Sequence, residues 1–120
     1  MSELHPALRF GTPLASDLIL EALLPDAVTQ LARDFAGAGC DAGFDALSFA
    51  SVFDFRDAVA ARLSHPTVSP HLPQLLYRVD VPEKFIKSAR AQAVSPETAL
   101  AELMIIRTLQ KVWLRRNYGK

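Results

Sequence analysis

Cysteine is almost absent from this chain. Its 120 residues include one cysteine, Cys40, so an internal disulfide cannot form. No apolar run approaches the roughly 18 residues that a membrane-spanning helix needs. The first residues, Met-Ser-Glu-Leu-His-Pro, have neither the basic start nor the apolar stretch of a secretory signal peptide. These absences predict a soluble, cytoplasmic protein with no membrane partner.

Signals for β-structure are equally scarce. The sequence has no alternating apolar and polar runs and no Asn-Gly or Asp-Gly pair, the usual hairpin turns. Apolar residues instead recur at steps of three and four, and half of all residues are hydrophobic. We therefore expect one all-α domain over residues 1–120, with five or six helices around a long C-terminal helix.

Motifs for catalysis and for metal binding are missing as well. There is no G-x-S-x-G turn, and Cys40 has no nucleophile signature around it. His65 and His71 lie in an irregular segment without cysteines or a carboxylate cluster, so no metal site is predicted. Gly37-x-Gly39-x-x-Ala42 has the spacing of a dinucleotide fingerprint, but it follows a helical pattern rather than a strand. No catalytic residue and no cofactor is predicted.

Charge is balanced overall and divided along the chain. Residues 1–60 hold three bases against nine acids, whereas residues 61–120 hold ten bases against four acids. The net charges of −6 and +6 make the two halves electrostatic complements. The simplest expectation is that they pack on each other; the alternative is that the basic half contacts an acidic partner or nucleic acid.

Residues 95–118 carry the clearest helix signal. Ser95 suits the N-cap, Pro96 the first helical position, and Gly119 a stop. The middle of this segment is apolar most of the way round, which is typical of a helix covered on several sides. Met104, Ile105 and Val112 lie away from the main apolar stripe, so we expect them to be exposed and to favour a symmetric dimer.

The N-terminal half shows three helical segments. One is expected from Thr12-Pro13 to Pro25, and a second from Pro25 to the glycine-rich stretch at 37–43. A third begins near Ser51 and carries an aromatic face, whose simplest role is in the core. A proline-rich connector at about 64–73 separates these helices from the C-terminal half.

Two further helices are expected before the long one. Leu72, Leu75, Leu76 and Val79 form one helical face, and Asp80 is the expected cap of the next helix, with Phe85 and Ile86 on its apolar side.

Three polar residues interrupt the apolar surface of the long helix: Glu102, Arg107 and Gln110. A buried charge needs a partner, and the segment before the helix offers Tyr77, Arg78 and Asp80. We predict that the side chains of Glu102 and Arg107 both turn toward that segment. Asp80 with Arg107 is the pair that we favour. If the pair is buried, loss of one partner is expected to cost about 3 to 5 kcal/mol.

The segment L-L-Y-R-V-D-V-P-E and the helix A-E-L-M-I-I-R-T-L-Q-K-V-W together resemble a small family of uncharacterised bacterial helical proteins. The resemblance covers about residues 72–116. It implies an all-α fold and carries no activity.

These observations favour a non-enzymatic interaction or regulatory module that binds itself or another protein. One alternative is an enzyme or small-ligand-binding protein that uses the set Tyr77, Arg78, Asp80, Glu102 and Arg107, called here the polar cluster. A second is a nucleic-acid contact through the basic residues Lys111, Arg115, Arg116 and Lys120. Nucleic acid is the less favoured partner, because the acidic half would oppose binding to phosphates.

Overall fold

A computed structural model describes residues 6–11, 14–15, 17–44, 49–92 and 95–118. The helices are α1 (Leu18–Gly37), α2 (Val52–Leu63), α3 (Leu72–Val79), α4 (Glu83–Gln92) and α5 (Pro96–Tyr118), with short 3-10 turns η1 (Pro6–Leu8) and η2 (Ser69–His71). The described residues contain no strand, and none of their helices is both long and apolar enough to cross a membrane. The expected all-α fold around a long C-terminal helix is confirmed.

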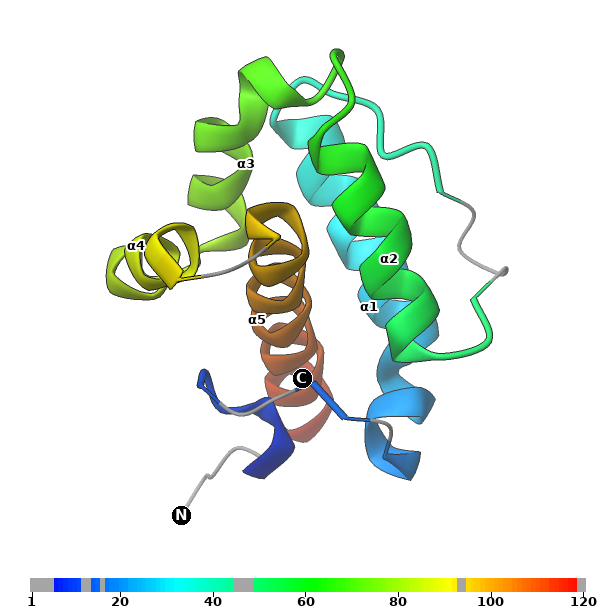
Figure 1. Cartoon of the computed structure of the whole chain (residues 1–120). Helices are drawn as coiled ribbons and strands as arrows, with labels where there is room; N and C mark the ends of the chain where they lie inside the picture. The colour runs from blue at the N-terminus through cyan, green and yellow to red at the C-terminus, as the bar shows by residue number, and fades with distance from the viewer. Residues whose placement is uncertain (1–5, 12–13, 16, 45–48, 93–94, 119–120) are drawn as a thin grey trace.

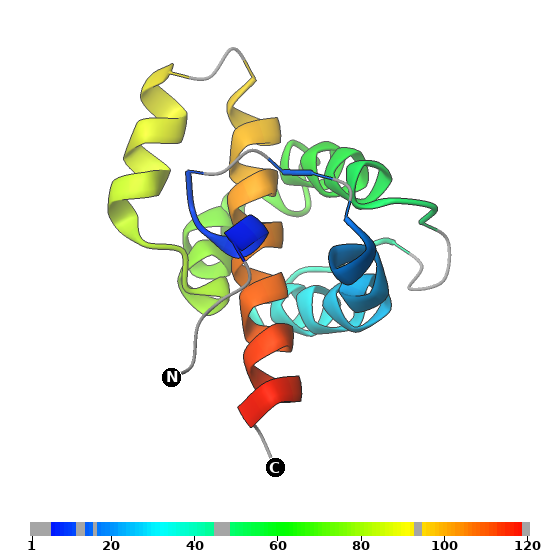
Figure 2. The same cartoon turned by 90° about the horizontal axis from the view of Figure 1, so that it is seen from below.

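Helix α5 is the centre of the arrangement. It contacts every other α-helix and η1. Helices α1 and α2 lie on one side of it and α3 and α4 on the other, as Figures 1 and 2 show. Its start is as predicted, because the Ser95 hydroxyl accepts a hydrogen bond from the backbone N–H of Thr98 at 3.4 Å. The predicted stop at Gly119 lies outside the described residues.

The expected exposure of Met104, Ile105 and Val112 is wrong. All three side chains are fully buried. Helices α1 and α2 pack against α5, and these three residues are part of its core, whereas Leu103 of the expected main stripe is only partly buried. These three residues therefore give no support to a dimer.

Helix α1 is also longer than expected. A single helix runs from Leu18 to Gly37 with Pro25 inside it, and it begins after Asp17, whose carboxylate accepts a hydrogen bond from the N–H of Ile19 at 2.8 Å. Pro25 costs the helix a hydrogen bond. Buried apolar residues on both sides of Pro25 hold the two parts in one helix; they include Leu20, Leu23, Leu24, Val28, Leu31 and Phe35. The predicted cap at Thr12-Pro13 lies outside the described residues.

Pro25→Ala is expected to stabilise the protein. Alanine restores the missing N–H and removes the steric conflict with the preceding turn, and Pro25 is exposed, so no packing is lost. We expect the free energy of unfolding to rise by about 1 to 3 kcal/mol, less a few tenths for the more flexible unfolded chain. Urea denaturation measures this, and a lower stability would show that the helix needs the proline.

The glycine-rich stretch after α1 ends the helix. The N–H of Cys40 donates to the carbonyl of Phe35 and that of Gly39 to the carbonyl of Ala36, both at 3.0 Å. This is a Schellman motif, and Gly39 occupies its left-handed position with φ +91°. Cys40 is buried beside it, and burial raises the pKa of its thiol, which disfavours the reactive thiolate form.

Helix α2 places Val52, Val59 and Leu63 of the predicted face in the core, but its buried aromatic residue is Phe55 rather than Phe53, which is only partly buried. Its N-cap is Ser51, whose hydroxyl accepts from the N–H of Asp54 at 3.2 Å. Phe55 is fully buried, and its ring lies 5.5 Å from that of Phe44 and 5.2 Å from that of Phe49. Phe44 also meets Phe35 edge to face, so these rings join α1 and α2.

Ion pairs connect the acidic and basic halves of the chain. Asp34 binds Lys111, Asp26 binds Arg116, and Arg56 binds Glu102. Each pair joins a residue before position 60 to a residue of α5. In the Asp34–Lys111 and Asp26–Arg116 pairs the acid comes from the acidic half and the base from the basic half, as the charge balance predicts, whereas Arg56–Glu102 has the opposite polarity.

Candidate functional site

The short helix α3 ends at Asp80, which adopts the left-handed conformation with φ 73° and ψ 49°. Its N–H donates to the carbonyl of Leu76 at 3.0 Å, closing the last turn. Asp80 therefore ends α3 and does not cap α4, which starts at Glu83. Aspartate is one of the few residues that accept this conformation, because its short polar side chain bonds locally.

Arg107 holds this helix end against α5. Its Nη2 donates to Oδ2 of Asp80 at 3.1 Å and its Nε to the carbonyl of Asp80 at 3.2 Å. Its Nη1 donates to Oε1 of Gln110, whose amide donates in turn to the carbonyl of Leu8. The predicted Asp80–Arg107 pair is present, but the Asp80 side chain is 73% exposed, so the penalty for breaking a buried pair does not apply.

Asp80→Ala and Asp80→Gly are expected to differ in stability. Both lose the carboxylate, but only alanine is strained in the left-handed conformation. We expect the alanine variant to lose about 1 to 2 kcal/mol of unfolding free energy and the glycine variant to stay within about 0.5 kcal/mol of the parent. Urea denaturation of both variants checks this, and equal losses would mean that the carboxylate, not the backbone, sets the cost.

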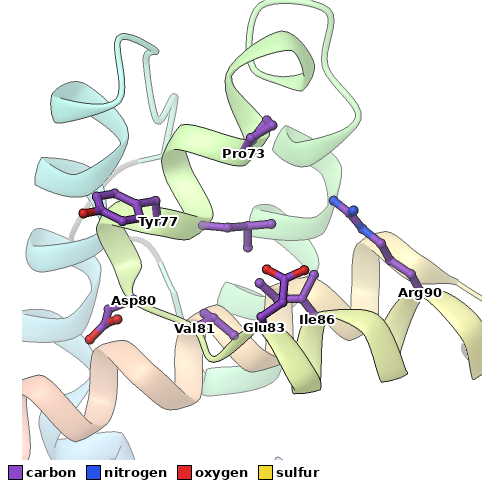
Figure 3. Close-up of a pocket in the computed structure, with 8 residues that line it drawn as sticks. Pro73, Tyr77, Asp80, Val81, Glu83, Ile86 and Arg90 are labelled. Carbon is purple, nitrogen blue, oxygen red and sulfur yellow. The ribbon is translucent and has the colours of Figure 1, made fainter.

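A groove lies between α3 and α4, and we call it the α3–α4 groove. It has a volume of about 360 Å³ and a buried apolar floor of Leu76, Val81 and Ile86. Figure 3 shows Tyr77 and Asp80 at one end and Arg90 at the other, with Glu83 between them. Among the described residues, the side chains of Glu83 and Arg90 have no hydrogen-bond or ion-pair partner, so both are free for a ligand or another chain.

No family model, curated protein or solved structure matches the chain. The resemblance over residues 72–116 therefore stays a prediction.

Tyr77 and Arg78 have different roles in the structure. Tyr77 is 85% exposed and forms part of the rim of the α3–α4 groove. Arg78 lies against the end of α1, where a Cβ added at Gly37 would collide with its guanidinium group. A cation at the C-terminus of a helix is favourable, because it complements the helix dipole. Arg78 therefore packs against α1. Tyr77 makes no comparable contact within the described part of the chain, and its ring faces solvent.

Glu102 does not join the other members of the polar cluster. Its Oε2 accepts a hydrogen bond from Nη1 of Arg56 on α2 at 3.2 Å, so the predicted turn toward residues 77–80 is wrong. Burial alone would lower the pKa of Arg56, but hydrogen bonds from its guanidinium to Asp57 and Glu102 raise it above the ordinary value. The base that Glu102 needed comes from 46 residues away in the sequence, a contact that no local pattern signals.

A second groove surrounds Glu102 and is called here the α4–α5 groove. It has a volume of about 360 Å³ and is lined by Phe10, Gly11, Phe85, Ser88, Ala89, Ala99, Glu102, Leu103 and Ile106. Since Tyr77 and Asp80 line one groove and Glu102 lines another, the polar cluster does not form a single site.

The end of α5 carries exposed apolar residues that the sequence reading missed. Leu114 and Tyr118 are both exposed. They lie on the same helical stripe as Arg107 and Lys111. Arg107 binds Asp80, and Lys111 donates to the carbonyl of Arg78. The side of α5 that faces α3 therefore continues beyond the end of α3 with an apolar surface. Steps of three and four residues counted from Arg107 place Leu114 and Tyr118 on the same side of the helix, so the sequence contains this signal.

The basic residues near the C-terminus have partners on α1. Lys111 lies 3.5 Å from Asp34, Arg115 donates to Gln30, and Arg116 donates to Asp26. Lys120 lies outside the described residues. Within the described ranges, no group of three or more His, Cys, Asp or Glu side chains could hold a metal ion.

Proposed function

We propose that this protein is a non-enzymatic interaction module that self-associates through the surface formed by α3 and the end of α5. This surface, called here the α3 face, consists of the α3–α4 groove with Tyr77 on its rim, together with Leu114 and Tyr118. The observation that carries the proposal is the 85% exposure of Tyr77 beside a groove with an apolar floor.

Tyrosine is well suited to anchor an interface. Its ring offers a large rigid contact area and its hydroxyl a hydrogen bond, and tyrosine is enriched among the residues that dominate binding energy. The side chain of Tyr77 makes no hydrogen bond with the described part of the chain, so its exposed position does not stabilise the monomer. The buried floor formed by Leu76, Val81 and Ile86 gives a partner side chain a fixed apolar surface to fill.

Charge on this surface favours a second copy as the partner. A twofold interface places one patch against itself, so a patch of one sign would repel its copy. The α3–α4 groove carries Asp80 at one end, Glu83 in the middle and Arg90 at the other end, as Figure 3 shows. An antiparallel arrangement of two such grooves brings Asp80 of each copy to Arg90 of the other.

The apolar end of α5 enlarges the same surface. Leu114 and Tyr118 lie on the same helical stripe of α5 as Arg107, which contacts the end of α3, and the two residues are 37% and 56% exposed. Stable interfaces bury about 800 Å² on each partner, more than a single groove provides. The two regions together offer a broader contact than the groove alone.

Sedimentation velocity over a wide range of protein concentrations tests this proposal. We expect the parent chain to form a dimer and Tyr77→Ala to weaken dimerisation by about thirtyfold or more, as for an interface hot spot. Leu18→Ala is the matched control, because Leu18 is a large, exposed apolar residue on α1, outside the α3 face. It is expected to leave the dissociation constant unchanged.

Two results would contradict the proposal. A parent chain that stays monomeric at high micromolar concentration would rule out self-association. A dimer that Leu18→Ala weakens while Tyr77→Ala does not would place the interface elsewhere on the molecule.

A further inference from the structure

We infer that the α4–α5 groove binds a small organic cation, an amine attached to a flat apolar group. This site is separate from the α3 face and does not depend on self-association. It is defined by Phe85 and Ala89 on α4, by Glu102 and Leu103 on α5, and by Phe10 before α1.

The walls of the groove fit an apolar body. Most lining residues are apolar, and a volume of about 360 Å³ lies within the range of small-molecule sites. The rings of Phe10 and Phe85 stack with centroids 4.8 Å apart and an angle of 28° between their planes. This stack fixes the segment before α1 against α4, so one wall is preformed. A flat ligand can pack along it without reordering the chain.

The polar group of the groove selects for positive charge. Glu102 and Ser88 are the lining residues with polar side chains. Arg56 binds only the Oε2 atom of Glu102, and Oε1 has no hydrogen-bond partner among the described residues. An ammonium group can donate to Oε1, a charge-assisted hydrogen bond that is stronger than a neutral one.

The charged groups bound to one another at Glu102 also carry a net negative charge. Arg56 is shared, since its Nε also lies 3.0 Å from Oδ1 of Asp57. Two carboxylates and one guanidinium leave a net charge of −1 at this place. Lys84 already places its ammonium group 5.2 Å from the Phe85 ring centroid, so this ring is not counted as a site for the ligand's cation, and the preference for an amine rests on Oε1 of Glu102. A cationic ligand is therefore favoured over a neutral or an anionic one.

Three probes of similar shape and different charge test the inference: 2-phenylethylamine, 2-phenylethanol and 3-phenylpropionate. Each is titrated into the full, isotope-labelled chain while the backbone amide signals are followed by NMR. We expect the amine to shift the amides of Ala89, Ala99 and Leu103 and to bind about tenfold more tightly than the alcohol. The propionate is expected to bind most weakly.

Two variants assign the preference to the groove. Glu102→Gln keeps the shape and can still accept from Arg56, so it is expected to reduce the amine affinity to that of the alcohol and to leave the alcohol unchanged. Ala89→Leu fills the groove and is expected to abolish binding of both. Glu97→Gln, an exposed site on α5 outside the groove, is the control and is expected to change neither affinity.

Several results would overturn the inference: equal binding of amine and alcohol, tightest binding of the propionate, no amide shifts with any probe, or the same loss in Glu97→Gln as in Glu102→Gln. Circular dichroism verifies that each variant is folded. If Glu102→Gln does not fold, the amine-to-alcohol ratio of the parent chain and its loss in Ala89→Leu decide the matter.

Discussion

Phe55→Ala is expected to lower the free energy of unfolding by about 3 to 5 kcal/mol, enough to unfold much of the protein at ordinary temperature. Phe55 is fully buried on α2. Its ring meets those of Phe44 and Phe49, so the substitution leaves a cavity and removes two aromatic contacts. A fixed backbone can close such a cavity only in part, which is why the cost exceeds that of lost apolar burial alone.

Phe53→Ala on the same helix is the matched control. Phe53 is only partly buried, and its ring lies 5.3 Å from the guanidinium carbon of Arg56. We expect it to lose about 1 to 2 kcal/mol, since much of its surface already meets water. Urea denaturation followed by circular dichroism gives both values. Equal losses would mean that the aromatic cluster around Phe55 is not the tightly packed part of the core.

Lys111→Met is expected to be the most damaging change on the polar surface of α5, with a loss of about 3 kcal/mol. Its partner Asp34 has a side chain that is only 7% exposed, and the two lie 3.5 Å apart between α1 and α5. Removing the lysine leaves a buried carboxylate whose remaining hydrogen bond comes from Gln30 at 3.4 Å. A buried charge without its partner is costly, because the carboxylate has lost its water.

The double variant Asp34→Leu with Lys111→Met separates the cost of the unpaired charge from the value of the pair. We expect it to recover most of the lost stability, since two apolar residues replace two desolvated charges. Arg116→Met is the control, because its partner Asp26 is about half exposed and that pair contributes at most about 1 kcal/mol. If the double variant recovers no stability and Arg116→Met causes a large loss, the ion pairs themselves stabilise the protein. The cost of an unpaired buried carboxylate would then not be the main effect.

Local signals in the sequence were sufficient for the helix type and for several boundaries. Ser51 and Ser95 begin α2 and α5 as predicted, because a side-chain cap acts within three residues of itself. The apolar face of α3 follows from spacing alone, and Leu75, Leu76 and Val79 are buried. The Asp80–Arg107 pair was also predictable, since Arg107 interrupts the apolar surface of α5 and the segment before the helix offers Asp80 as a carboxylate.

Other predictions failed where a contact far along the chain outweighed a local one. Pro25 predicts a helix boundary, yet burial on both sides of it continues α1. Glu102 binds Arg56 rather than residues 77–80 because α2 packs beside α5, which no spacing within α5 reveals.

The amino-acid sequence by itself determined that this chain is helical, where α2, α3 and α5 begin, and that its two halves carry opposite net charge. Those properties depend on neighbours a few residues apart or on net charge. Only the tertiary structure decided that Ile105 is buried while Tyr77 is exposed, and that the polar cluster is divided between two grooves. Burial and cavities arise where whole helices meet, and the direction from which each helix is covered is not encoded in its own periodicity.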